Sequence, residues 1–183
     1  ADIYLIHVGP AHTEADILVH VPSAGVLFAG DVVFWGCVLN CFRFVLNDRV
    51  TVGCFRSHAR NALIRLVGVY VFGGGLTEFS VMEIYRCNPV AWAGAAPRIV
   101  RTLKDIAQMD KIDLIVPGHG PVVNKTALDV LAGYWAFVGE VAQSCFNDGV
   151  EATPCARDAL PSLPYPFYDW DHPERLYINV DVQ

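Results

Sequence analysis

The feature that most constrains the fold is a run of short apolar segments interrupted by glycine and proline. Three segments near the N-terminus predict strands, at Asp2–Val8, Ile17–Val21 and Val26–Ala29. The third is entirely apolar and Ile112–Val116 is nearly so, which is typical of strands buried on both faces. We therefore expect these strands to form a sheet with connections at both ends.

Two longer segments have the periodicity of amphipathic helices, at Pro97–Met109 and at Asn124–Asn147. Asn124 can cap the second helix, and Gly149 can end it. The pair Thr153-Pro154 suits the N-cap and the first position of one more short helix. Helices that alternate with buried strands predict a layered arrangement, a mixed sheet flanked by helices.

We expect residues 161–183 to form a C-terminal tail. Between Pro161 and Pro173 it is rich in proline and aromatic residues. We expect it to be ordered and to pack on the surface.

Composition limits the class of protein. With 183 residues, 54% of them apolar and 17% charged, the chain suits a single globular domain. The net charge of −6 argues against a nucleic-acid partner, because binding to phosphates needs a surplus of basic residues. No apolar stretch has the length of a membrane span, so no membrane partner is expected. Composition does not indicate an oligomeric state.

The chain begins at Ala1 and enters a strand directly, which suggests a piece of a longer protein. Its six cysteines form neither a CxxC pair nor the dense pattern of a small disulfide-rich protein. Free thiols in a reducing compartment are therefore expected, and with them a cytoplasmic location.

Residues 37–86 differ from the rest of the chain. The stretch 38–86 holds six arginines and three acidic residues, and all eleven prolines lie outside it. Joining Gly36 to Cys87 gives GDVVFWGCNPVAWAG, which reads as uninterrupted sequence. The flanking codons permit a splice donor and a splice acceptor, so we hypothesise a translated intron of a eukaryotic gene. The alternative is a genuine insertion, such as a lid over the site.

Three motifs place a metal-competent side chain directly after a predicted strand: His12 in GPAHTEAD, Asp31 in FAGD and His119 in VPGHGP. The adjacent glycines and prolines let the backbone turn sharply, so the side chains can converge at one edge of a shared sheet. Each alone is more often a turn or cap residue. Together they indicate a metal site, because imidazoles bind zinc or iron and a carboxylate can bridge two ions.

The order and context of these motifs resemble the metallo-β-lactamase superfamily. PAHTEAD, VLFAGDVVF and DLIVPGHGPV are similar to its third, fourth and fifth motifs, and the resemblance spans residues 2–37 and 87–181. It implies that His12 binds a first zinc ion, that Asp31 bridges two, and that His119 binds the second, with iron or manganese as alternatives. Asp at position 31 is nearer to the glyoxalase II-like dinuclear hydrolases, whereas Ala15 stands where the family usually has glycine.

The superfamily's HxHxDH motif is absent. It would supply three further histidines and an aspartate that is the candidate proton acceptor, so no catalytic residue is assigned here. The resemblance therefore implies residues 1–183 as a single partial domain, the C-terminal half of a layered αββα sandwich with a large apolar sheet face exposed. Each ion would keep only two protein ligands, too few for a catalytic zinc, so we expect this chain to be inactive or weak by itself.

The implied function is hydrolysis of thioesters, lactones, amides or similar small acyl compounds. The alternative is a non-catalytic remnant or binding protein with an incomplete metal site. Phosphodiester hydrolysis of nucleic acid is a third option, which the acidic balance disfavours. The other histidines, His7, His20, His58 and His172, are expected not to bind metal.

Overall fold

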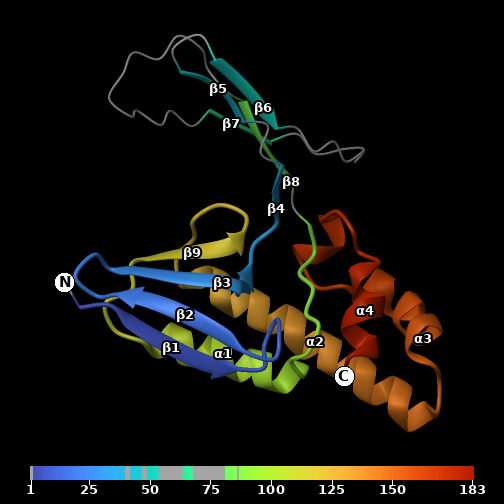
Figure 1. The fold of residues 1–183 in the computed structure, drawn as a ribbon. Helices are drawn as coiled ribbons and strands as arrows, with labels where there is room; N and C mark the ends of the chain where they lie inside the picture. The colour runs from blue at the N-terminus through green and yellow to red at the C-terminus, as the bar shows by residue number, and fades with distance from the viewer. Residues whose placement is uncertain (1, 40–41, 47–48, 54–63, 68–80, 86) are drawn as a thin grey trace.

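The computed structural model describes residues 2–39, 42–46, 49–53, 64–67, 81–85 and 87–183. Its main body is a four-stranded mixed sheet with helices on one face (Figure 1). The strands are β1 (Tyr4–Gly9), β2 (Asp16–Val21), β3 (Val26–Phe34) and β9 (Leu114–His119), in the order β1-β2-β3-β9. The expectation of a mixed sheet combined with helices is confirmed.

Connection lengths explain the strand directions. β1, β2 and β3 are joined by short turns and pair antiparallel, whereas β3 and β9 are parallel because the chain returns through a helix between them. Gly25 closes the turn between β2 and β3 with a φ of 64°, a conformation that glycine adopts without strain.

The helices are α1 (Ala96–Gln108), α2 (Thr126–Asp148), α3 (Ala152–Ala159) and α4 (Arg175–Asp181), with two short 3₁₀ helices at Leu160–Ser162 and Phe167–Asp169. The two long predicted helices are confirmed within about two residues. Gly149 ends α2 in the left-handed conformation, as expected.

Two predicted helix starts are wrong. Asn124 lies two residues before α2, where its side chain accepts a hydrogen bond from the Thr126 amide in a local turn instead of capping the helix. Thr153 lies inside α3 and not at its N-cap, because Glu151 occupies that position without a side-chain cap.

The core lies between one face of the sheet and the helices. Leu18, Leu27 and Ile115 from the strands are fully buried, and they belong to one cluster with side chains of α1 and α2 such as Leu103 and Leu131. This burial follows from the apolar stripes that predicted the two helices.

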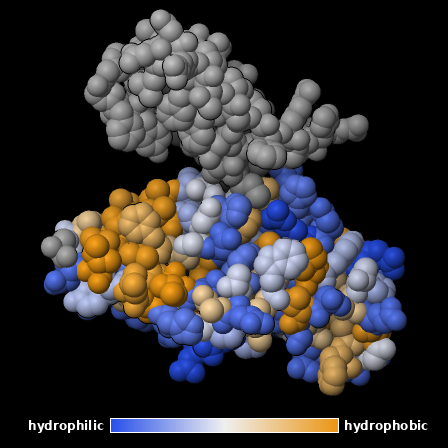
Figure 2. Space-filling model, viewed as in Figure 1, coloured by the Kyte–Doolittle hydropathy of each residue, from blue (hydrophilic) through white to orange (hydrophobic). Residues whose placement is uncertain are grey.

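The opposite face of the sheet is apolar and open. Leu5, Ile17, Phe28 and Leu114 are 71%, 54%, 46% and 49% exposed. The register sets Leu5 beside Val19, Val19 beside Phe28 and Phe28 beside Val116, so one row of apolar side chains crosses the sheet. Figure 2 shows these residues' side of the sheet as an apolar area over β1, β2 and β3. The prediction that β3 and β9 are buried on both faces is therefore wrong, whereas the exposed apolar sheet face that the resemblance implied is observed.

The C-terminal residues do more than pack on the surface, so that prediction is also wrong. Phe167 and Leu176 are fully buried and Trp170 is nearly so, and all three belong to the main core cluster. The aromatic residues that marked this segment insert between the other elements: the Phe167 ring lies 4.6 Å from that of Tyr134 on α2.

The expectation of free thiols is wrong for three cysteines of the described residues: Cys87, Cys145 and Cys155 are all disulfide-bonded. Cys145 near the end of α2 and Cys155 in α3 form a disulfide across ten residues of sequence. The turn between α2 and α3 brings the two cysteines together, and the spacing of cysteines in the sequence does not reveal it. The predicted cytoplasmic location stays a prediction.

Segment 37–86 contributes no described strand to the main sheet. Its described strands form two small sheets: β4 (Cys37–Leu39), β8 (Val81–Tyr85) and β7 (Ile64–Val67) in one, and β5 (Phe42–Leu46) with β6 (Arg49–Gly53) in the other. Cys37 pairs with Tyr85, so the chain leaves and re-enters the main body at one place. The intron hypothesis stays a prediction, and much of the segment, His58 included, lies outside the described residues. None of the helices described is long and apolar enough to cross a membrane.

Candidate metal centre

The three predicted ligands lie at the same end of the main sheet. His12 lies in the loop between β1 and β2, Asp31 lies in β3, and His119 is the last residue of β9. β1, β3 and β9 all run in one direction, so the ends at which these residues occur are neighbours.

Two details differ from the sequence-based expectation. Asp31 lies within β3 rather than after it, because the strand continues to Phe34 with an irregular register around Gly30. Gly30 has a φ of 51°, and such an irregularity changes the direction in which the next side chain points. His119 is likewise in β9 and not just beyond it.

The structure brings the three side chains together. His12 Nε2 lies 3.4 Å from Asp31 Oδ2, and His119 Nε2 lies 3.6 Å from Asp31 Oδ1. Each carboxylate oxygen thus faces a different imidazole. Exposure increases from His12, whose side chain is 11% exposed, to Asp31 at 35% and His119 at 46%, so the group opens toward solvent on the His119 side.

A backbone contact fixes the orientation of His12. Its Nδ1 lies 2.8 Å from the carbonyl oxygen of Val90, and because a carbonyl can only accept, Nδ1 carries the hydrogen. In the neutral imidazole Nε2 is then the bare nitrogen, and it faces an oxygen of Asp31. Two such acceptors repel each other unless a proton or a cation lies between them. This is the tautomer in which a histidine binds a metal through Nε2.

Aromatic packing orients His119. Its ring stacks on that of Phe34, with centres 4.4 Å apart and planes 22° from parallel. The Arg175 guanidinium lies 5.3 Å from the centre of the Phe34 ring, and burial lowers the pKa of Arg175. The main chain is fixed as well, because the Trp35 amide donates to the His119 carbonyl at 2.9 Å.

The glycine before His119 is required by the close approach of two strands. A Cβ at position 118 would overlap the carboxylate of Asp31 and the backbone of Gly30. Gly118 therefore lets β9 approach β3 closely enough for His119 to face Asp31.

The distances suit a pair of ions bridged by the carboxylate. Ligand atoms roughly 2.0–2.2 Å from a tetrahedral zinc ion lie about 3.3–3.6 Å from one another. The separations of 3.4 and 3.6 Å agree with that spacing. Over the described part of the chain, no group of three or more His, Cys, Asp or Glu side chains forms a candidate metal site.

The other described histidines lie elsewhere. His20 is buried on β2 and its Nε2 lies 3.1 Å from the Lys111 carbonyl oxygen, while Nδ1 of His172 lies 2.9 Å from a carboxylate oxygen of Glu174. His7 is exposed on β1.

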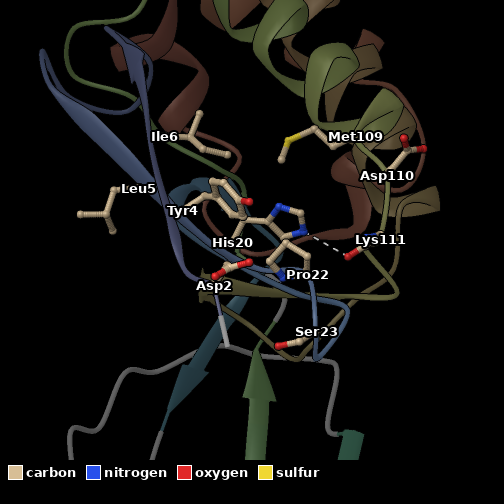
Figure 3. Close-up of a pocket in the computed structure, with 10 residues that line it drawn as sticks. All are labelled: Asp2, Tyr4, Leu5, Ile6, His20, Pro22, Ser23, Met109, Asp110 and Lys111. Atoms are coloured by element: carbon tan, nitrogen blue, oxygen red, sulfur yellow. Dashed lines mark hydrogen bonds between the residues drawn. The ribbon is translucent and has the colours of Figure 1, made fainter.

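A separate pocket of about 580 Å³ lies at the opposite end of the strands (Figure 3). It is lined by Tyr4, His20, Met109 and Lys111 among others, and it includes none of the three candidate ligands. This pocket is therefore distinct from the candidate metal centre.

Sequence reasoning missed the residues that support His12. Val90 acts through its backbone, and nothing in a sequence shows which carbonyl meets a side chain 78 positions away. Asn88 and Asn179 are completely buried and hydrogen-bonded to the main chain of the same region, as described below. Nothing in the sequence distinguishes an asparagine that becomes buried from one that stays exposed.

No protein-family model matches this chain, and no curated protein matches it in sequence.

Proposed function

We propose that this chain carries part of the metal centre of a zinc-dependent hydrolase of acyl-type substrates, of the glyoxalase II-like kind within the metallo-β-lactamase superfamily. The observation that supports the proposal is the convergence of His12 and His119 on opposite oxygens of Asp31. These residues are far apart in sequence, and turn formation alone does not require imidazoles there.

In this proposal, Asp31 would offer one carboxylate oxygen to each of two ions, His12 would hold the first through Nε2, and His119 would hold the second through Nε2. Zinc, when bound, polarises the acyl oxygen of a substrate and makes a water nucleophilic at neutral pH. The open side at His119 leaves room for a small-molecule substrate to approach. Iron or manganese would suit the same donors.

We propose further that the complete fold is a layered αββα sandwich. The open apolar face of the main sheet requires a covering layer, because contiguous apolar surface of this kind seldom stays in water. The metal centre also requires ligands beyond His12, Asp31 and His119, since a catalytic zinc generally has three protein ligands. A second sheet layer that brings the missing ligands satisfies both needs, and the chain without it has little or no activity.

The proposal is tested by zinc binding to the 183-residue chain, measured by competition with a chromogenic chelator. We expect measurable but weak zinc binding, because each ion would have only two protein ligands from this chain. The substitutions His12→Ala, Asp31→Asn and His119→Ala should each weaken it about tenfold or more, because removing a ligand costs at least as much as removing its hydrogen-bond partner. His172→Ala is the matched control, since Nδ1 of His172 is paired with the Glu174 carboxylate.

Equal zinc affinity in the wild-type chain and in all three ligand variants would contradict the proposal. That result would favour the second candidate, a non-catalytic binding protein or remnant. The finding that supports this candidate is that the described residues include no group of three metal-binding side chains arranged for one ion.

A further inference from the structure

A hydrogen-bonded chain connects the C-terminal helix to His12. It begins at Asn179, which is completely buried in α4 beside the extended segment 87–95 (Figure 1). Asn179 Oδ1 accepts a hydrogen bond from the Ala91 amide at 3.1 Å, and its Nδ2 donates to the Pro89 carbonyl at 3.0 Å. The Asn179 side chain is therefore hydrogen-bonded to the main chain on both sides of Val90.

The contact with Ala91 matters most, because the Ala91 N–H and the Val90 C=O belong to one planar peptide group. On one side this group donates to Asn179, and on the other it accepts from Nδ1 of His12 at 2.8 Å. Fixing the N–H therefore also fixes the direction of the carbonyl. In such a chain each hydrogen bond polarises the next, so the Asn179 contact strengthens the one to His12.

Neighbouring contacts hold this segment in place. The Trp92 amide donates to the His12 carbonyl at 2.8 Å, so the segment pairs with His12 through main chain as well as side chain. A Cβ at Gly94 would overlap the backbone of Ala11, which shows how closely the segment approaches the β1–β2 loop. At its other end Asn88 donates to the carbonyls of Phe167 and Asp171 at 3.0 and 3.2 Å.

Asn179 also contacts α2. Its Nδ2 also donates to the Tyr134 hydroxyl at 2.7 Å, and Tyr134 is fully buried. Burial raises the pKa of Tyr134, so the partner hydroxyl stays neutral. The amide orientation itself is set by Ala91 and Pro89, because the Ala91 N–H can only donate to Oδ1 and the Pro89 carbonyl can only accept from Nδ2.

We infer that Asn179 is a positioning residue for the metal centre: through the Val90–Ala91 peptide it holds His12 in the tautomer whose Nε2 is free to bind a metal. That these hydrogen bonds serve a metal centre rests on the proposed function. The hydrogen bonds themselves are contacts within this chain. It assigns to the C-terminal helix a part in the site that none of the three motifs contains.

The inference is tested by long-range ¹H–¹⁵N NMR of the histidine side chains in the metal-free 183-residue chain. The wild-type chain should show the Nδ1–H tautomer for His12. Asn179→Ala should give a mixture of both tautomers, because the Val90 carbonyl loses its fixed direction, and should weaken zinc binding about 10- to 100-fold. Asn179→Asp should restore the wild-type tautomer, since a carboxyl kept protonated by burial has an acceptor for the Ala91 amide and a donor for the Pro89 carbonyl.

Tyr134→Phe is the matched control, because it removes a buried partner of Asn179 without touching the Ala91 contact. It should lower stability and leave the His12 tautomer unchanged. An unchanged tautomer in folded Asn179→Ala overturns the inference, and so does an altered tautomer in folded Asn179→Asp or in Tyr134→Phe. A wild-type chain with the expected tautomer but no zinc binding overturns the proposed function alone.

Discussion

At the residue scale, the candidate centre is set by hydrogen bonds and packing around three side chains. Sequence context identified His12, Asp31 and His119, because their residue types suit metals and because each adjoins a strand. It could not identify Val90, Phe34 or Asn179, whose contributions arise from contacts formed only in the folded chain. Ligand types can therefore be read from the sequence, whereas the groups that orient them cannot.

Phe34→Leu tests whether aromatic packing orients His119. Phe34 is 4% exposed and stacks on the His119 ring. A leucine of similar size should cost less than about 1.5 kcal/mol of unfolding free energy. It should nevertheless weaken zinc binding several-fold, because His119 loses its stacking partner. Phe146→Leu is the control, since Phe146 is 82% exposed on α2. Chelator competition and chemical denaturation measure both effects, and unchanged zinc affinity in Phe34→Leu would refute the role.

At the scale of elements, the pattern of apolar residues predicted the bounds of the helices well. It predicted poorly which faces of the strands are buried. The apolar stripe of Pro97–Met109 fixed α1 almost to the residue. The apolar runs of β3 and β9 predicted burial on both faces, but Phe28 and Leu114 are exposed. A run of apolar residues shows what a strand can bury, and not whether a covering layer is present. Similarly, the aromatic C-terminal segment gave no periodic signal, although Phe167 and Trp170 enter the core.

Gly118→Ala tests the close approach of β3 and β9. The added methyl group would overlap the Asp31 carboxylate and the Gly30 backbone, so one strand or the side chain has to move. We expect a loss of about 1–3 kcal/mol in unfolding free energy together with weaker zinc binding. Gly133→Ala within α2 is the matched control: its methyl group meets nothing within 4 Å and should stabilise the helix by roughly 0.5–1 kcal/mol. Denaturant titrations compare the unfolding free energies of the two variants. Equal changes in Gly118→Ala and Gly133→Ala would contradict a close approach of β3 and β9 at Gly118.

At the scale of the whole molecule, the main sheet and the described strands of segment 37–86 form separate sheets. The main sheet consists of β1, β2, β3 and β9, and the described strands of the segment pair only among themselves. Its ends meet where Cys37 pairs with Tyr85. The change in composition at these boundaries was visible in the sequence, whereas the meeting of the two ends was not.

Deleting residues 37–86, with Gly36 joined directly to Cys87, should therefore leave the main body folded. We expect the far-ultraviolet circular dichroism of the helices to be retained, and zinc binding to match that of the full chain. Loss of cooperative unfolding in the deletion variant would show that the segment is needed for the fold.

The central claim, that His12, Asp31 and His119 share metal ions, is tested most directly by anomalous X-ray scattering at the zinc edge from crystals of the chain grown with zinc. The account predicts anomalous peaks between the Asp31 carboxylate and the two imidazoles, within roughly 2.0–2.2 Å of Nε2 of His12 and Nε2 of His119. A map with zinc only at other residues, such as His172 and Glu174, and none beside Asp31 would contradict it.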